Sequence, residues 1–470
     1  MTLARDLAWK NYNENVVPGT ISHQWARYAL SVNYDTLPPE VVHQAKRILL
    51  DTFACAIGAS EAPGRPILEG AVREIGGNPE ASVFGSGYQT TAINATLVNC
   101  FMVRYLDYND MGGGGHNSES IPPILAVAER EKASGRDFLT SVVLSYEIGQ
   151  RITDSIRGAN LENRGWNVDC RAGLSLPAPL GKLMGLNEDQ ITNAIATAGA
   201  HAPSLGILDC HREEFAMAKN LRFGFVAQHC ILSCLVAKGG FTGFIRIVEG
   251  DKGYNQVICN NEMDLEKLVD FTGWKILNGS FKTICQNYTT QAHILATLAL
   301  VKEHDLKPED IASVKIKPCL RDSRHVVTIP GKKYPRNTES ATHSAFFGNA
   351  MVIKERALGP AQLTPEKFND PVILDLIEKI TIEADPNLEE FQDTGTSIIT
   401  TKDGRVLEKF MPYPHGNWRD PLTDAEVEEK FRGAAAPHMD EAKIKNFIDT
   451  VWSVDKLANM KDLAKLMVWG

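Results

Sequence analysis

The feature that most constrains the fold is a change of periodicity near residue 280. Up to about residue 278, apolar residues recur at helical spacing in one segment after another. After residue 280, the runs 311–318 and 379–385 alternate with period two, and residues 396–411 form two such runs around an Asp-Gly pair, a strong hairpin signal. From about residue 410 the helical pattern returns. The sequence therefore predicts a helical part, a mixed α+β part, and a second helical part.

The helical segments of the first part are rich in Ala and Gly on several faces, which is typical of helices packed closely on all sides. Helices are expected at residues 37–60, 91–107, 121–135, 137–152, 175–186, 187–202 and 218–240. In the C-terminal part, Thr423 and Glu426 have the spacing of a capping box. The pattern leaves open whether the C-terminal helices pack on the first part or on the α+β part.

Length and charge bound the class of protein. A chain of 470 residues is too long for one simple core, so two domains are expected. The net charge is -9 and no block of Lys or Arg forms a basic stripe, which argues against nucleic acid as a partner. The N-terminus lacks the apolar region of a signal peptide, and we expect no membrane-spanning stretch, so we predict a cytoplasmic protein.

The nine cysteines are scattered, and no zinc or disulfide spacing occurs among them. We interpret them as reduced, mostly buried thiols of a cytosolic protein. They are Cys55, Cys100, Cys170, Cys210, Cys230, Cys234, Cys259, Cys285 and Cys319.

The stretch LDYNDMGGGGHNSES, residues 106–120, is the most unusual segment. It is not a phosphate loop, because no G-x-x-x-x-G-K-[ST] pattern is present and a helix precedes it. Asp107 and Asp110 are expected on one face of the last helical turn, where carboxylates oppose the helix dipole. Such a cost favours a functional role, although both acids could instead be solvated or cap loop amides. Gly112–Gly115 are expected to act as a hinge that places His116.

Three further segments offer chemical groups. Lys219 and Arg222 are three apart on a predicted helix face, which is also the pattern of two surface cations. Lys282 and Asn287 lie near the change of periodicity, and Trp166-Asn167 suggests a pocket wall. A metal site from the two acids and His116 is conceivable, but no H-x-x-x-H or cysteine pair supports it, and we expect none.

These motifs together resemble the MmgE/PrpD family. The run YLDYND…H, then GW before a small-residue helix, then KNLRFG, then the lysine at residue 282, occur in the family's order. The segments LPPEVVHQAKRILLDTFACAIGAS and DGRVLEKFMPYPHGNWRDPLTDAEVEEKFR are also similar to the family, so the likeness spans nearly the whole chain.

The resemblance implies a mainly α fold with a large all-helical domain and a smaller α+β lid. We expect residues 1–278 plus 410–470 to form the helical domain and residues 279–409 to form the lid. It also implies a homodimer, no metal or organic cofactor, and an active site in the cleft between the domains. Its members include 2-methylcitrate dehydratase, cis-aconitate decarboxylase and iminodisuccinate epimerase.

Carried over position by position, the resemblance identifies candidate catalytic residues: Asp107, Asp110, His116, Lys219 and Lys282. It leaves Arg222, Met111, Asn167, Trp166 and Asn287 as candidate substrate-binding residues. At three of these positions the chain departs from the family: relatives often have Thr, His and His where this sequence has Met111, Asn167 and Asn287. The loop of glycines also replaces bulkier residues.

The family's reactions share proton transfer at a carbon next to a carboxylate, and cations must neutralise the charge that develops. The first hypothesis is a cofactor-independent lyase that dehydrates or decarboxylates a citrate-like di- or tricarboxylate. The second is an isomerase or epimerase of an amino-dicarboxylate, which the three departures favour because no hydroxyl has to leave. The third is a non-catalytic relative. In each enzymatic case His116 suits the role of acid or base near neutral pH.

Overall fold

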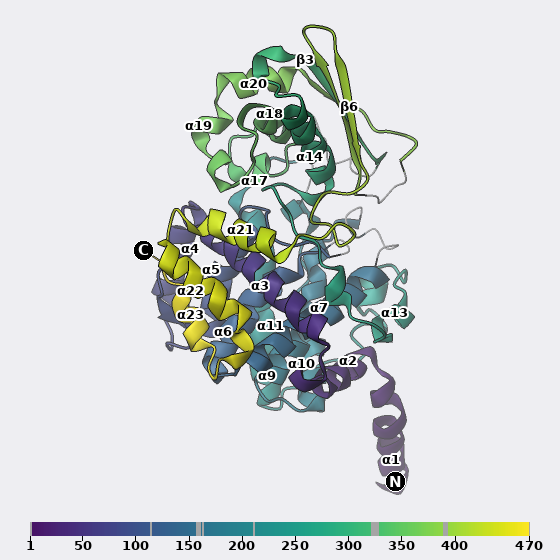
Figure 1. The fold of residues 1–470 in the computed structure, drawn as a ribbon. Helices are drawn as coiled ribbons and strands as arrows, with labels where there is room; N and C mark the ends of the chain where they lie inside the picture. Colours follow the sequence, from purple (N-terminus) through teal and green to yellow (C-terminus); the bar gives the residue numbers. More distant parts are fainter. Residues whose placement is uncertain are drawn as a thin grey trace.

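The computed structural model describes residues 2–112, 115–156, 161, 164–209, 212–320, 329–388 and 393–469. Most of these residues are helical, and the strands are few and short (Figure 1). The mainly α fold with a smaller α+β part, predicted from the sequence, is therefore confirmed.

The larger, helical part is built around a few long helices that are buried on most faces. Two of them, α3 and α5, pack against each other, and α11 packs on α5 and α10. Small residues allow these close contacts: a Cβ on Gly224 of α11 would lie 3.2 Å from Leu97 of α5. The main helices are α2 (Ile21–Ser31), α3 (Pro39–Gly58), α4 (Gly64–Ile75), α5 (Ala92–Arg104), α6 (Ile121–Glu131), α7 (Gly135–Ser155), α9 (Pro177–Leu183), α10 (Glu188–His201) and α11 (Arg222–Lys238).

The C-terminal helices return to this helical part. They are α21 (Asp424–Ala435), α22 (Glu441–Trp452) and α23 (Lys461–Leu466). Helices α21 and α22 pack on α3, and α23 packs on α6, as the yellow segment in Figure 1 shows. The capping box predicted at Thr423 and Glu426 is present at the start of α21. The chain thus leaves the helical part, forms the α+β part, and comes back.

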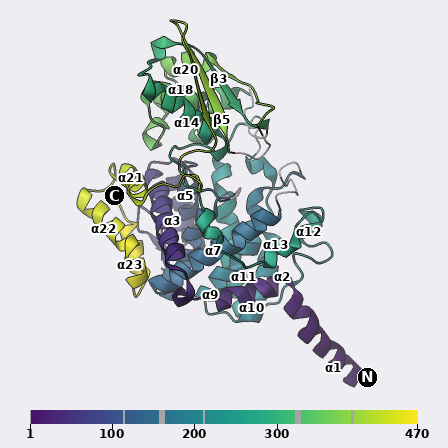
Figure 2. The ribbon, with the colours of Figure 1, turned by 45° about the vertical axis from the view of Figure 1, so that its right-hand side comes forward.

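The α+β part contains one sheet with strand order β4-β3-β5-β6. Strand β3 (Ile311–Pro318) is parallel to β4 (Ile380–Ile382) and antiparallel to β5 (Gly395–Thr401), which pairs with β6 (Val406–Met411). Gly404 has φ +91° in the turn between β5 and β6, so the predicted hairpin is confirmed. Helices α14 (Tyr288–Glu303), α18 (Ala345–Glu355) and α20 (Pro371–Glu378) lie beside this sheet (Figure 2).

The first helix, α1 (Thr2–Asn11), projects away from the body in both views (Figures 1 and 2). It carries two large apolar side chains that are exposed, Leu7 at 58% and Trp9 at 60%. A helix of this length is marginally stable in water by itself.

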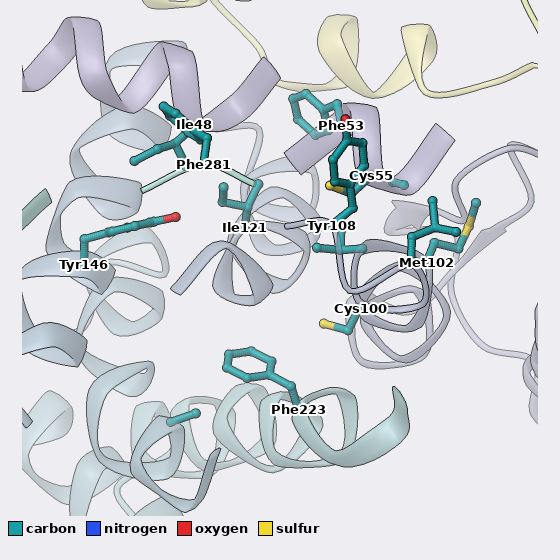
Figure 3. Packing of buried hydrophobic residues seen from close by; sticks show 14 of the residues in the cluster. Ile48, Phe53, Cys55, Cys100, Met102, Tyr108, Ile121, Tyr146, Phe223 and Phe281 are labelled. Atoms are coloured by element: carbon teal, nitrogen blue, oxygen red, sulfur yellow. The ribbon is translucent and has the colours of Figure 1, made fainter. Parts of the chain in front are cut away.

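The core is continuous through the helical part. Figure 3 shows Phe53 and Cys55 of α3 close to Tyr108, and Phe223 of α11 facing Cys100 of α5. Eight of the nine cysteines belong to the part of the chain that the structure describes; they are buried, as predicted, and they form no disulfide there. Cys210 lies outside the described residues.

One apolar segment meets the length and composition of a membrane span. The segment Met217–Lys238, which includes α11, is long and apolar enough to cross a membrane by length and composition. Of its most apolar window, 61% is buried inside the protein. That burial is the pattern of a core helix, whose apolar residues pack on neighbouring helices.

Candidate active site

Asp107 lies at the centre of the candidate site, in a tight turn after α5. Helix α5 ends at Arg104, three residues earlier than the sequence predicts, and Asp107 adopts a left-handed backbone conformation with φ +46°. Non-glycine residues rarely adopt this conformation, and they cluster at functional sites when they do. The predicted shared face of Asp107 and Asp110 on a last helical turn is therefore wrong. The turn sends the two carboxylates to different partners.

Four groups converge on the Asp107 carboxylate, which is 1% exposed; three of them come from distant parts of the chain. Lys282 Nζ contacts Oδ1 and donates to the Asp107 carbonyl at 2.8 Å. Lys219 Nζ lies 3.4 Å from Oδ2, and Arg104 Nη2 lies 3.5 Å from it. His343 Nε2, from the α+β part, lies 2.9 Å from the same oxygen. Arg104 is a near neighbour in sequence, but only the tertiary fold brings Lys219, Lys282 and His343 to Asp107.

The electrostatics of this cluster follow from burial and crowding. Burial by itself raises the pKa of Asp107, but the charges of Arg104 and Lys282 outweigh it and hold that pKa well below its usual range. Burial, together with the charge of Arg104, lowers the pKa of Lys219 to about 8. Burial also lowers the pKa of Lys282, although Asp107 opposes that shift. The site thus contains an ionised carboxylate and at least one lysine that can exchange a proton near neutral pH.

His116 is oriented by a backbone group. Its Nδ1 lies 2.6 Å from the carbonyl oxygen of Asp110, so Nδ1 carries the proton and donates, and Nε2 is left as the basic nitrogen. The ring is 8% exposed, and burial beside Arg104 and Lys282 lowers its pKa well below 6.5. His116 is therefore neutral at pH 7, in the form that can accept a proton.

The Asp110 carboxylate is engaged elsewhere. It accepts hydrogen bonds from Ser118 N at 3.2 Å, Ser118 Oγ at 2.5 Å and Tyr146 OH at 2.7 Å. Burial raises the pKa of Asp110, and these hydrogen bonds oppose the rise. Its side chain thus fixes the loop that carries His116 and does not contact the Asp107 cluster.

The glycine loop is shaped by close contacts. Gly112 and Gly115 exchange two backbone hydrogen bonds, of 2.8 and 3.0 Å; Gly113 and Gly114, which complete the predicted hinge, lie outside the described residues. A Cβ on Gly115 would lie 1.8 Å from the guanidinium of Arg171, and one on Gly112 would lie 2.8 Å from Gln150 Oε1. At Gly115, then, the space of a side chain is taken by Arg171.

Arg222 and Asn167 lie together on another side of the cluster. Arg222 Nε is 2.5 Å from Asp169 and Nη1 is 2.6 Å from Asp209, so its guanidinium is paired with two carboxylates. Helix α11 begins at Arg222, and Lys219 precedes it on a 3-10 turn, η8 (Met217–Leu221), so the two cations do not share a regular helix face. Asn167 caps the turn that contains Asp169, with its Oδ1 accepting from the Asp169 amide at 2.9 Å.

The remaining predicted residues make local hydrogen bonds around the site. Met111 and Ser280 exchange two hydrogen bonds of 2.8 Å, which bring the Asp107 loop beside Lys282. Trp166 pairs with Leu205 through an isolated bridge. The side chain of Asn287 caps α14. Its backbone N–H donates to the carbonyl of Thr342, next to His343, at 2.7 Å. His343 follows the residue that is hydrogen-bonded to Asn287, and its imidazole reaches the Asp107 carboxylate.

Three residues of the site were not predicted: Arg104, Glu119 and His343. A signal existed for Arg104, because a charge inside the apolar run NCFMVRYLD must be buried and paired. Glu119 is fully buried, with Oε1 3.5 Å from Arg104 Nε. Burial raises its pKa to about 7, against the opposing charge of Arg104. His343 is one histidine among twelve, and no spacing marked it.

A buried lysine of α21, Lys430, connects three segments next to the site. Lys430 Nζ donates to Asp51 Oδ1 at 2.6 Å, to the Tyr108 carbonyl at 2.8 Å and to the Lys282 carbonyl at 2.9 Å. It therefore ties α3, the Asp107 loop and the Lys282 segment together. The returning C-terminal helices thus contribute directly to site geometry.

Among the described residues, no group of three or more His, Cys, Asp or Glu side chains could hold a metal ion. The candidate catalytic side chains are all buried. A cavity of about 770 Å³ lies elsewhere, lined by Glu214 and by segments 330–336 and 368–378. None of the candidate catalytic residues lines it, so its size carries no argument for catalysis.

Two family models match the chain. The MmgE/PrpD N-terminal domain matches residues 23–266, and the MmgE/PrpD C-terminal domain matches residues 285–456. Together they cover well over half of the sequence. The chain belongs to the MmgE/PrpD family, as the motifs indicated.

Several relatives of the chain are named as decarboxylases or dehydratases, which are lyases. The chain is 23% identical to the cis-aconitate decarboxylase of Aspergillus terreus, with 95% of this chain and 96% of the relative covered. It is 23% identical to the human cis-aconitate decarboxylase, over 95% and 94% of the two chains. A 2-methylcitrate dehydratase-like protein of Aspergillus oryzae is also 23% identical, over 78% of each chain. These likenesses relate the chain to lyases that act on citrate-like compounds.

Proposed function

We propose that this protein is a cofactor-independent lyase that dehydrates or decarboxylates a citrate-like di- or tricarboxylate. The observation that supports it is the group of buried cations around Asp107. Arg104, Lys219 and Lys282 each contact this one carboxylate. His343 is neutral at pH 7, because burial lowers its pKa well below 6.5.

The charges of this cluster do not cancel. Among the groups in direct contact, three cations face Asp107, and Glu119, which contacts Arg104, adds one negative charge only when it is ionised, so this set stays positive in either case. Uncompensated buried charge is costly, and an anion that joins the cluster relieves that cost. A substrate with two or three carboxylates fits this requirement.

The proposed chemistry uses His116 and Lys219. His116 Nε2 takes the proton from the carbon next to a carboxylate, and the electron pair of the broken C–H bond moves toward that carboxylate. The cations around Asp107 stabilise the negative charge that develops there. In dehydration, the pair then forms the C=C bond as the C–O bond breaks, and the Lys219 ammonium gives its proton to the departing hydroxide, which leaves as water.

Decarboxylation would use the same groups in another order. The C–C bond to one carboxylate breaks, CO₂ leaves, and the electron pair remains on carbon, stabilised by the same cations. The carbanion then takes a proton from Lys219. Because all these groups are buried, substrate access requires the α+β part, which carries His343, to move away from the helical part.

The test is a panel of small hydroxy- and unsaturated polycarboxylates assayed in D₂O. We expect water loss or CO₂ release with at least one of them, and a loss of activity of about 10²–10⁴-fold in His116→Ala and Lys219→Ala, the usual effect of an acid or base. His304→Ala, an exposed histidine on the α+β part, is the control and should keep full activity. Full activity in either site variant would refute the assignment, as would no turnover of any compound.

The second candidate is an isomerase or epimerase of an amino-dicarboxylate. Met111 has no hydroxyl to assist a leaving group, and the side chain of Asn287 caps α14, so fewer acids are available for a departing hydroxyl. Deprotonation by His116 and reprotonation from Lys219 would suffice for such a reaction. Deuterium incorporation at the α-carbon without net water or CO₂ loss would identify it.

We also propose that the protein is a homodimer. Helix α1 projects from the body with Leu7 and Trp9 exposed, and such a short unpacked helix gains stability by docking on a second copy. Light scattering coupled to gel filtration should give twice the monomer mass, reduced in Trp9→Ser. A monomer at micromolar concentration would refute the proposal.

A further inference from the structure

Glu119 is a buried group of the site that the proposed mechanism does not use. It lies on the short turn η4 (Asn117–Ser120), directly after His116, and its side chain is 0% exposed. Neither carboxylate oxygen accepts a hydrogen bond from any residue that the structure describes. Its contact with Arg104 Nε, at 3.5 Å, is an ion pair that lacks the distance and alignment of a good hydrogen bond.

Other buried glutamates of this chain differ in this respect. Glu129 accepts from Ser82 Oγ at 2.7 Å and from the Ser82 amide, and Glu147 accepts from Arg151 Nη1 at 2.7 Å and from the Ile276 amide at 3.0 Å. A buried carboxylate without donors costs on the order of 1–3 kcal/mol or more. Such groups are few in native proteins and call for an explanation, and a ligand that donates a hydrogen bond to the carboxylate is one.

Buried donors without acceptors lie in the same region. Nη1 of Arg104 and Nη2 of Arg171 have no hydrogen-bond partner among the described residues, and the same holds for Nδ2 of Asn167. Arg171 is within range of the charge of Glu119 and sits against Gly115, beside His116. The region thus has hydrogen-bond donors that suit carboxylates, and one acceptor, Glu119, that suits a group with a hydrogen to donate.

Resting on the proposed function, we propose that Glu119 accepts a hydrogen bond from a hydroxyl or amino group on the carbon chain of the polycarboxylate substrate. The arginine N–H groups that lack partners face the substrate carboxylates, and Glu119 faces the hydroxyl or amino group of the substrate. An unsaturated tricarboxylate without such a donor, such as cis-aconitate, leaves Glu119 unpartnered and binds more weakly. The preferred substrate class is therefore a hydroxy- or amino-polycarboxylate.

The titration of Glu119 distinguishes the two kinds of donor. Burial raises its pKa to about 7, so the group is largely ionised at pH 8 and largely protonated at pH 6. An ammonium group stabilises the ionised form through charge and hydrogen bonding, whereas a hydroxyl contributes the hydrogen bond only. Affinity for an amino ligand should therefore fall more steeply from pH 8 to pH 6 than affinity for a hydroxyl ligand.

The test measures binding of ligands that differ only in the donor. Isothermal titration at pH 8 would compare succinate with malate and aspartate, and tricarballylate with citrate. We expect at least one donor ligand to bind about tenfold or more tightly than its donor-free counterpart, the usual effect of a hydrogen bond to a charged group. Glu119→Gln should reduce this preference and Glu119→Met should abolish it, with affinity for succinate and tricarballylate kept or improved.

Glu129→Gln is the matched control, because Glu129 is also buried with a pKa raised to about 7 and is held by Ser82 away from the cluster. It should leave the preference unchanged. Equal affinity for donor and donor-free ligands in the unmodified protein overturns the inference even if no Glu119 variant folds. Binding of all carboxylates without preference leaves the proposed function standing, whereas binding of none overturns both.

Discussion

Lys219 gives the most direct prediction, because its pKa of about 8 lies inside the measurable range. An ordinary lysine has a pKa of about 10.5, so the site disfavours its charged form by roughly 2.5 pKa units, or on the order of 3 kcal/mol. Burial is the main cause, and the neighbouring Arg104 adds to it. At pH 7 about nine-tenths of the Lys219 side chains would be protonated, and at pH 9 about one-tenth.

If the Lys219 ammonium donates the proton in catalysis, kcat/KM should be level near pH 7 and fall about tenfold per pH unit above pH 8. His116 should add no loss between pH 7 and pH 6, because burial keeps its pKa well below 6.5. The assay is initial-rate kinetics from pH 6 to pH 10 on the best substrate of the D₂O panel, in buffers of constant ionic strength.

Two variants separate this account from a general effect of alkali. Lys219→Arg keeps the charge but titrates above pH 12, so the fall near pH 8 should disappear together with most of the activity. Lys182→Met is the control, because burial also lowers the pKa of Lys182, which donates to the Ala29 carbonyl on α2, away from Asp107. A profile that stays flat to pH 10, or a Lys219→Arg variant that retains the same fall near pH 8, would refute the reasoning.

The same lysine affects stability with a sign that follows from its shift. Its folded pKa lies below its unfolded pKa, so between about pH 8 and pH 10.5 the unfolded chain binds more protons than the folded one. The contribution of Lys219 to the free energy of unfolding therefore rises with pH across that window, while its contribution to catalysis falls. Denaturant unfolding at pH 8 and pH 10, compared between the unmodified protein and Lys219→Met, would measure it; a larger gain in the variant would contradict the sign.

Three further outcomes are expected. Gly115→Ala should lower the free energy of unfolding by about 1–3 kcal/mol, because its Cβ would lie 1.8 Å from the Arg171 guanidinium, whereas Gly19→Ala, with nothing within 4 Å, should have little effect. Lys430→Met should cost about 3–5 kcal/mol in denaturant unfolding, because it leaves Asp51 buried without its cation; a loss below 1 kcal/mol would show that Asp51 is compensated elsewhere. Activity should survive EDTA, and a loss that a divalent ion restores would overturn the cofactor-free proposal.

Local structure was largely predictable from the sequence. The hairpin at Gly404 and the capping box at Thr423 depend on residues a few positions apart, and both are present. The end of α5 was misplaced because Tyr105 and Leu106 continue the apolar pattern, while the turn at Asp107 is imposed by contacts with Lys282 and His343. Short-range preferences cannot register such contacts, since they form only when the domains pack.

The candidate site was predictable only in part. The motifs singled out Asp107, Lys219 and Lys282, and the structure brings these three together. Arg222 has the same local appearance as Lys219, yet it pairs with Asp169 and Asp209. Which of two neighbouring cations faces a site depends on a 3-10 turn of five residues and on the segments packed against it.

By itself, the sequence determined the fold class, the order of helical and mixed parts, and the family, because periodicity, turn residues and motifs are local properties of the chain. Only the tertiary structure decided which charges share a buried space. Arg104, Glu119 and His343 come from α5, η4 and the α+β part. They can be recognised as site residues only from their distances to Asp107 and to one another. Electrostatic interaction and desolvation depend on position in space, so the chemistry of this site is a property of the packed domains.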